Sequence, residues 1–183
     1  MNMPINHSLD GIWQAYKTTL DCLKIAKRSI AKNDPCLLAK TNFMGAVKDE
    51  AEQQIEQSWA NADDYVILSL WTAFERILLV YVQEENQRML TETATCFTHS
   101  IQQKIADDTE YWRIDDVLDF FKTAISSDLI GQAKQVKRYR DWVAHRNEKK
   151  ATPANVTPKM AYDILTEIIR QLTEHEYFQY GNP

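Results

Sequence analysis

The chain has 183 residues and a formal net charge of −5, and its length fits one domain with its own core, so we expect a single domain over residues 1–183. With only four Gly and five Pro, and with helix-favouring residues spread throughout, the composition predicts an all-α fold and not a turn-rich sheet protein. The acidic balance argues against a protein that coats nucleic acid by bulk electrostatics.

The amino-terminal half is expected to contain amphipathic helices. The first covers residues 8–31, and the Asn-Asp-Pro sequence at 33–35 breaks it. Residues 41–42, Thr-Asn, are suited to cap a second helix that continues through KDEAEQQIEQSW. The apolar segment 65–82 forms a third and most buried helix. It is either continuous with the second or separated from it by a kink near residues 61–64.

The segment 65–82, YVILSLWTAFERILLVYV, approaches the length of a membrane span. It carries Glu75 and Arg76 near its middle, and each would cost about 2.5–3.5 kcal/mol at a bilayer centre. We therefore expect a core helix of a soluble protein and no membrane partner.

The carboxyl-terminal half is expected to add shorter helices. Between residues 87 and 109 the pattern weakens, which predicts a loop with one short helix. Asp115 and Asp116 open the segment 117–125, VLDFFKTAI, because carboxylates are stable at the positive end of a helix dipole.

Two longer helices are expected to follow. Ser-Ser-Asp at 126–128 caps a helix that ends near residue 146, and Thr157 with Pro158 begins a last amphipathic helix. The expected architecture is an up-and-down bundle of about five or six helices. The inward face of the penultimate helix is predicted to hold Ile130, Ala133, Val136 or Lys137, Tyr139 or Arg140, and Val143.

The cysteines and the first residues indicate a cytoplasmic protein without a cofactor. Cys22, Cys36 and Cys96 are far apart and form no CxxC pair, so neither a disulfide framework nor a structural zinc site is supported. We expect reduced, mostly buried thiols. Cys96 and His99 alone are too few for a metal site, and MNMPINHSLDG at the start has neither a basic region nor an apolar run of a signal peptide.

Positive charge is concentrated around RYRDWVAHRN, residues 138–147. From residue 134 to 150 seven Lys or Arg residues stand against two acids, a local balance of +5 in an acidic chain. Within this segment Arg140 is followed by the polar Asp141, by the apolar triplet Trp-Val-Ala and then by His145. Four residues therefore separate Arg140 from His145.

This motif resembles the signature of the HEPN superfamily, small helical bundles whose ribonuclease members carry an arginine, a polar residue and then a histidine after four to six intervening positions. The layout is also similar, with an apolar central helix early in the chain and one helix after the motif. The resemblance implies a metal-independent endoribonuclease that acts on RNA at a homodimer interface. It also implies a toxin or antiphage effector, with a cognate antitoxin protein as a further partner.

The motif residues have expected roles in transfer of an RNA phosphate to its own 2′-hydroxyl. His145 is the general acid/base and Arg140 the phosphate clamp. Asp141, one helical turn before His145, is expected to accept a hydrogen bond from the imidazole and fix its tautomer. Glu75 either supports the motif or lies with Arg76 on a solvated stripe. Further RNA contacts are expected from Arg138, Arg146, Lys137 and Lys149.

Spacing alone does not single out this motif. Arg170 and His175 repeat it, and Arg138 with His145 matches the variant with six intervening residues. Only Arg140 is followed both by a polar residue and by the apolar triplet. Three other interpretations stay open: an ordinary helix end whose basic residues complement the dipole, a catalytically inactive HEPN-type module that binds RNA or a protein, and a four-helix enzyme or binding scaffold unrelated to the family.

Overall fold

The computed structural model describes residues 7–92, 96–145, 153 and 155–180. Every regular element in these ranges is helical, so the all-α prediction is confirmed. Two 3-10 turns, Thr109–Tyr111 and Phe121–Thr123, accompany seven α-helices in the described chain. The helices are α1 (His7–Lys32), α2 (Pro35–Leu38), α3 (Lys48–Glu92), α4 (Cys96–Asp108), α5 (Ile114–Phe120), α6 (Ser127–His145) and α7 (Pro158–Tyr180).

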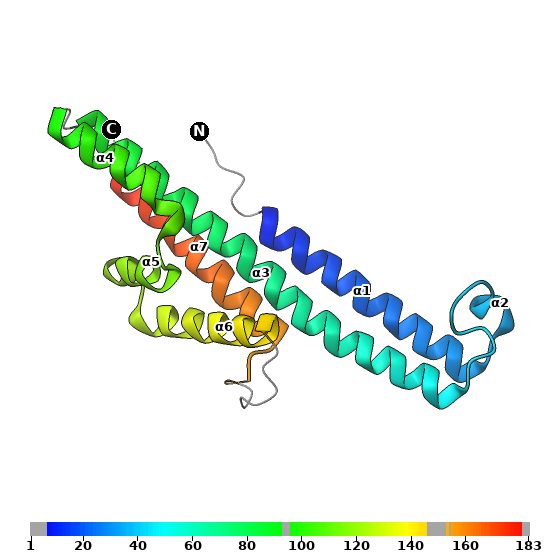
Figure 1. Cartoon of the computed structure of the whole chain (residues 1–183). Helices are drawn as coiled ribbons and strands as arrows, with labels where there is room; N and C mark the ends of the chain where they lie inside the picture. The colour runs from blue at the N-terminus through cyan, green and yellow to red at the C-terminus, as the bar shows by residue number, and fades with distance from the viewer. Residues whose placement is uncertain (1–6, 93–95, 146–152, 154, 181–183) are drawn as a thin grey trace.

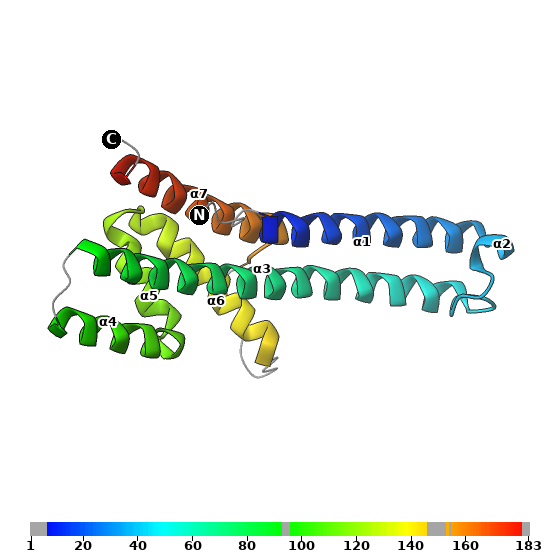
Figure 2. The same cartoon turned by 90° about the horizontal axis from the view of Figure 1, so that it is seen from above.

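Helix α3 is the axis of the molecule. It has 45 residues, and at 1.5 Å per residue it is about 68 Å long. Helix α1 packs against its amino-terminal half, and α4 to α7 gather around its carboxyl-terminal half (Figures 1 and 2). The molecule therefore has two parts. We call α1, α2 and residues 48–72 of α3 the arm, and the remainder the body.

The main hydrophobic core lies where the body meets the base of the arm. Trp71, Phe74 and Leu78 of α3 are fully buried there. Because burying a side chain of this size contributes about 1.5–3 kcal/mol, this cluster dominates the stability of the fold. Helices α6 and α7 close the core with Ile130, Ala133, Val136, Leu165, Ile168 and Ile169.

By length and composition α3 is also the one described helix that could cross a membrane. That finding is weak evidence, because the core helix of a soluble protein passes the same test. The burial of the α3 side chains in the core is consistent with such a core helix.

Two helix starts predicted from capping residues in the carboxyl-terminal half are confirmed, whereas α5 begins at Ile114 and has Asp115 and Asp116 inside its first turn. Ser126 Oγ accepts a hydrogen bond from the backbone N–H of Leu129 at 3.3 Å, at the start of α6. Thr157 Oγ1 accepts from the N–H of Met160 at 3.2 Å, at the start of α7. Both side chains satisfy one of the free N–H groups of a first helical turn.

The prediction for residues 33–48 is partly wrong. Helix α1 ends at the predicted break, but Pro35 also begins the short α2, whose N–H groups bind the Asp34 carboxylate at 3.0 and 3.3 Å. Residues 41–42 do not cap α3, which begins only at Lys48. Thr41 Oγ1 instead donates to the carbonyl of Leu38 at 2.7 Å and closes the turn after α2.

The loop predicted for residues 87–109 is wrong as well. Helix α3 runs without a kink through residues 61–64 and continues to Glu92, and α4 fills 96–108. This segment holds five Thr against one Glu and one Lys, so neither a strong helix propensity nor an apolar stripe marks it as helical. Thr109, completely buried, anchors the end of α4 by donating to the carbonyl of Ile105 at 2.5 Å.

Two of the thiols expected to be mostly buried are exposed. Cys22 lies on α1 and Cys36 on α2. Both belong to the arm, where two paired helices cover only one face of each other. The side chain of Cys96 lies outside the described part of the structure.

Candidate functional site

The predicted motif occupies the last turns of α6, which crosses α3 in the body (Figure 1). Tyr139 fixes this part of α6, because its hydroxyl donates to Asp64 Oδ1 on α3 at 2.9 Å. Burial and the hydrogen bond to Asp64 raise the pKa of Tyr139 to about 12. The residues that follow Tyr139 are therefore held in a defined position relative to α3.

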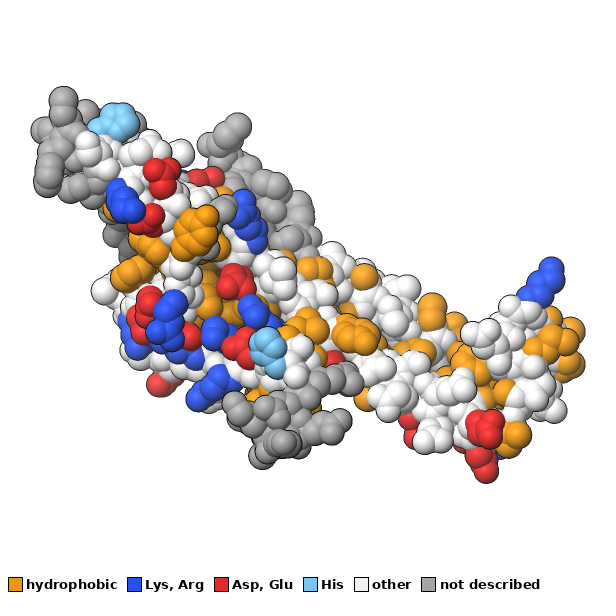
Figure 3. All heavy atoms as spheres, viewed as in Figure 1, with side chains coloured by type: hydrophobic (Ala, Val, Ile, Leu, Met, Phe, Trp, Pro, Cys, Tyr) orange, Lys and Arg blue, Asp and Glu red, His pale blue; other side chains and the backbone are white. Residues whose placement is uncertain are grey.

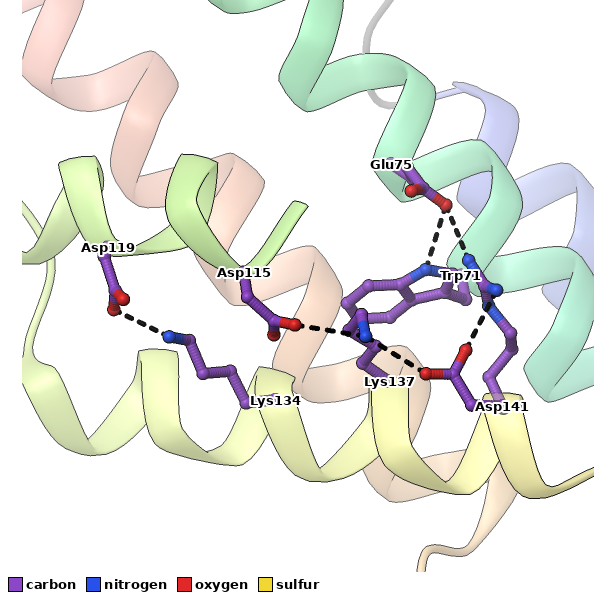
Figure 4. Close-up of polar contacts among 8 residues, drawn as sticks. Trp71, Glu75, Asp115, Asp119, Lys134, Lys137 and Asp141 are labelled. Atoms are coloured by element: carbon purple, nitrogen blue, oxygen red, sulfur yellow. Dashed lines mark hydrogen bonds and ion pairs between the residues drawn. The ribbon is translucent and has the colours of Figure 1, made fainter. Parts of the chain in front are cut away.

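Arg140 points toward α3. Its Nη2 donates to Glu75 Oε2 at 2.7 Å, and its guanidinium lies over the Trp71 ring, 5.7 Å from the centroid. The indole Nε1 of Trp71 donates to the same Glu75 oxygen at 3.1 Å (Figure 4). The Arg140 and Glu75 side chains are only 24% and 31% exposed. Of the two alternatives for Glu75, the structure has the one in which it reaches the motif.

Asp141 binds two cations. Its Oδ2 lies 3.0 Å from Lys137 Nζ and its Oδ1 lies 3.0 Å from Arg140 Nη1. In the described part of the chain no hydrogen bond joins Asp141 to His145, so the contact expected from the helical spacing is not formed. Lys137 and His145 stand four residues to either side of Asp141. Asp141 therefore pairs with the lysine four residues before it and not with the histidine four residues after it.

Helix α5 places two further carboxylates against α6. Asp115 Oδ2 lies 3.1 Å from Lys137 Nζ, and Asp119 Oδ1 lies 2.7 Å from Lys134 Nζ (Figure 4). Asp119 also binds Lys122 at 2.7 Å. Partial burial lowers the pKa of Lys137, but the hydrogen bonds to Asp141 and Asp115 outweigh it, so the pKa is raised. Hydrogen bonds from Lys122 and Lys134 lower the pKa of Asp119.

These contacts offset much of the local positive charge that the sequence places here. Figure 3 shows Lys, Arg, Asp and Glu side chains intermixed over α5 and α6. The sequence carries a signal for this arrangement. Asp115 and Asp119 are four residues apart on α5, and Lys134 and Lys137 three apart on α6, so each pair shares a helix face. Which face of α5 packs against which face of α6 is decided only by tertiary packing.

His145 is exposed at the carboxyl end of α6, and Arg138 is exposed two turns before it. Arg146 and Lys149, both expected to bind RNA, lie outside the described residues. The structure thus brings together Glu75, Lys137, Arg140 and Asp141 in one network and leaves the histidine facing solvent.

The second match to the motif has different surroundings. Arg170 on α7 is exposed, and its Nη2 and Nε donate to Glu167 at 2.6 and 2.8 Å. It also donates to Glu174. These hydrogen bonds raise the pKa of Arg170 and lower that of Glu167. All three residues belong to α7, and the side chain of His175 lies outside the described part.

The chemistry available at the α6 site is proton transfer and charge stabilisation. An exposed imidazole can accept or donate a proton near neutral pH, and a fixed guanidinium can stabilise a developing negative charge. Within the described residues, no three His, Cys, Asp or Glu side chains gather in a group that could hold a metal ion.

Comparisons of this chain with protein-family models, curated proteins and solved structures found no match. The resemblance to the HEPN superfamily therefore rests on the motif residues and on the order of the helices.

Proposed function

We propose that this chain is a HEPN-type, metal-independent endoribonuclease. The observation that carries the proposal is the contact between Glu75 and Arg140. An acidic residue of the central helix holds the motif arginine, and the motif histidine stands exposed one turn further along α6. An ordinary helix end needs no such partner from another helix, since exposed basic residues already complement its dipole.

His145 acts as the general acid/base in this proposal. It takes the proton of the RNA 2′-hydroxyl or gives one to the leaving 5′ oxygen, while Arg140 stabilises the phosphorane oxygens. The Arg140 Nε is buried without a hydrogen-bond partner among the described residues, while Nη1 binds Asp141 and Nη2 binds Glu75. In this proposal the phosphate takes the place of the Asp141 carboxylate at Nη1. Arg138, exposed on the same helix, supplies a second phosphate contact.

One histidine cannot be acid and base in the same step. In a homodimer whose two copies of the motif face each other, the partner supplies the second histidine. The products are a 2′,3′-cyclic phosphate and a 5′-hydroxyl. A toxin or antiphage role in the cytoplasm, with a cognate antitoxin, belongs to the proposal through the HEPN resemblance.

A second function, binding of RNA or a protein without cleavage, is favoured by a different observation. Glu75 and Asp141 together already neutralise the Arg140 guanidinium. A phosphate has to displace the Asp141 carboxylate before Arg140 can bind it. If that exchange does not occur, the same surface binds a partner without reacting.

Incubation of the purified protein with single-stranded RNA in EDTA tests the proposal. We expect cleavage with 2′,3′-cyclic phosphate ends, and a rate about 10²–10⁴-fold lower for His145→Ala, the range typical of a lost general acid/base. If wild type and His145→Ala bind RNA equally and leave it equally intact, the non-catalytic module replaces the enzyme.

A further inference from the structure

The arm has two unlike faces. On one of them charged residues of α1 and α3 meet, as in the salt bridge between Lys27 and Glu56 at 3.0 Å. The other holds an uncharged stripe whose residues are exposed except for the half-buried Ala62. We call this stripe the neutral face; it comprises Ala15, Thr19 and Cys22 of α1 and Ser58, Ala62, Tyr65, Ser69 and Thr72 of α3.

The spacing of the neutral face is that of a helix-packing seam. Residues 58, 62, 65, 69 and 72 follow one another at intervals of four and three, and residues 15, 19 and 22 repeat the pattern on α1. Such intervals keep side chains on one side of a helix and are the repeat by which helices pack in coiled coils. In a chain with 26% charged residues, two adjacent stripes without a charge predict a covered surface.

The Ser and Thr hydroxyls of the neutral face already have partners within their own helices. Thr19 donates to the carbonyl of Ala15 at 3.0 Å, and Ser69 to that of Tyr65 at 2.9 Å. Ser58 and Thr72 make the same contact one turn back, at 2.8 and 2.9 Å. Because these four donors are satisfied internally, they can be buried without losing a hydrogen bond.

The neutral face carries both a projection and a groove. Tyr65 is 56% exposed and supplies the largest side chain of this face. Beside it lies a groove of about 360 Å³ between α1 and α3. Small side chains form part of its lining, which includes Ala15, Thr19, Ala62 and Ser69. A surface with a projection and a matching hollow fits a second copy of itself, related by a two-fold axis.

The size and the place of this face also fit a second copy. The neutral face spans residues 58–72 of α3, about 22 Å, by two helix diameters, so it offers on the order of 450 Å² per copy, the size of a weak dimer interface and below the roughly 800 Å² per copy of a standard one. Figure 3 shows mainly uncharged side chains over the arm, with charges gathered over α5 and α6 on the same side of the molecule. The carboxyl end of α6 is the end nearer the arm (Figure 1).

We propose that the neutral face is the homodimer interface of this protein, with Tyr65 of each copy seated in the groove of the other. This inference deepens the proposed function, because it supplies the dimer on which a composite site depends. The absence of charge from this face argues against RNA as its occupant.

Light scattering coupled to gel filtration tests the interface. At tens of micromolar we expect wild type to have about twice the 21.3 kDa mass of the chain. Tyr65→Glu should weaken dimerisation at least about a hundredfold, since it buries an unpaired charge at the centre of the contact. Tyr111→Glu is the matched control, because Tyr111 is 86% exposed outside the arm, and it should stay dimeric. Ser69→Arg is a second disrupting variant, placed at an exposed site. Circular dichroism verifies that each variant is folded.

A monomeric wild type overturns the inference, and so does a dimer that survives both Tyr65→Glu and Ser69→Arg. RNA cleavage by the same samples keeps the two proposals apart. If the dimer survives both Tyr65→Glu and Ser69→Arg and the protein cleaves RNA, the proposed nuclease activity is retained and this interface is rejected. A monomeric Tyr65→Glu that cleaves RNA at the wild-type rate supports the interface and contradicts the composite dimeric site.

Discussion

Four residues separate both Arg140 and Arg170 from a histidine, but the carboxylates that bind these two arginines lie in different parts of the fold. Arg140 binds Glu75 on another helix and lies over Trp71, and its side chain is 24% exposed. Arg170 is 50% exposed and binds two glutamates of its own helix. Such pairs within one helix contribute about 0.3–0.5 kcal/mol and form wherever the spacing allows.

A short motif therefore needs evidence beyond its residue spacing. Both matches satisfy the spacing, so the spacing cannot separate a site from a solvated helix face. A partner contributed by a distant part of the chain can, because it positions the arginine at one place in the fold. Only the α6 match has such a partner among the described residues.

Truncation of the two arginines should give unequal losses of stability. We expect Arg140→Ala to lower the free energy of unfolding by about 2 kcal/mol, because it leaves the Glu75 carboxylate half-buried without its cation and uncovers Trp71. Arg170→Ala should cost less than about 0.5 kcal/mol. Urea unfolding measures both. Equal losses would remove the structural distinction between the two matches.

Loss of the Tyr139 hydroxyl should have a smaller effect that depends on pH. Because the folded-state pKa of Tyr139 is raised from 10.0 to about 12, its hydrogen bond to Asp64 stabilises the fold fully below pH 10 and is lost as the pH rises toward 12.

At pH 8 we therefore expect Tyr139→Phe to be less stable than wild type by about 1 kcal/mol, with the difference shrinking between pH 10 and 12. Urea unfolding across this range measures it, with Tyr111→Phe at an exposed site as the unchanged control. A difference that stays constant with pH would show that the lost contact is not the one to Asp64.

The sequence predicts those helices that have both a cap and an apolar stripe. Ser126 and Thr157 begin α6 and α7 as expected, and the stripe of α1 places its ends within one residue. It fails for α4 and for the end of α3, where no apolar stripe is present. These two helix segments pack on each other, a tertiary contact that local patterns do not reveal.

The candidate site is predictable to a similar degree. The sequence offers a contact of Glu75 with the motif as one of two alternatives, and the structure has Glu75 bound to Arg140; the roles of Arg140 and His145 stay predictions. It does not predict that Asp141 binds Lys137 in place of His145, because the helical spacing offers both partners equally. Nor does it predict the carboxylates of α5, whose approach to α6 depends on tertiary packing.

We propose that the α6 match, and not the α7 match, is a site that acts on RNA. The most direct test compares cleavage of single-stranded RNA in EDTA by wild type, His145→Ala and His175→Ala. We expect His145→Ala to cleave RNA about 10²–10⁴-fold more slowly than wild type, and His175→Ala to cleave at the wild-type rate. Equal rates for all three proteins, or a loss confined to His175→Ala, would contradict it.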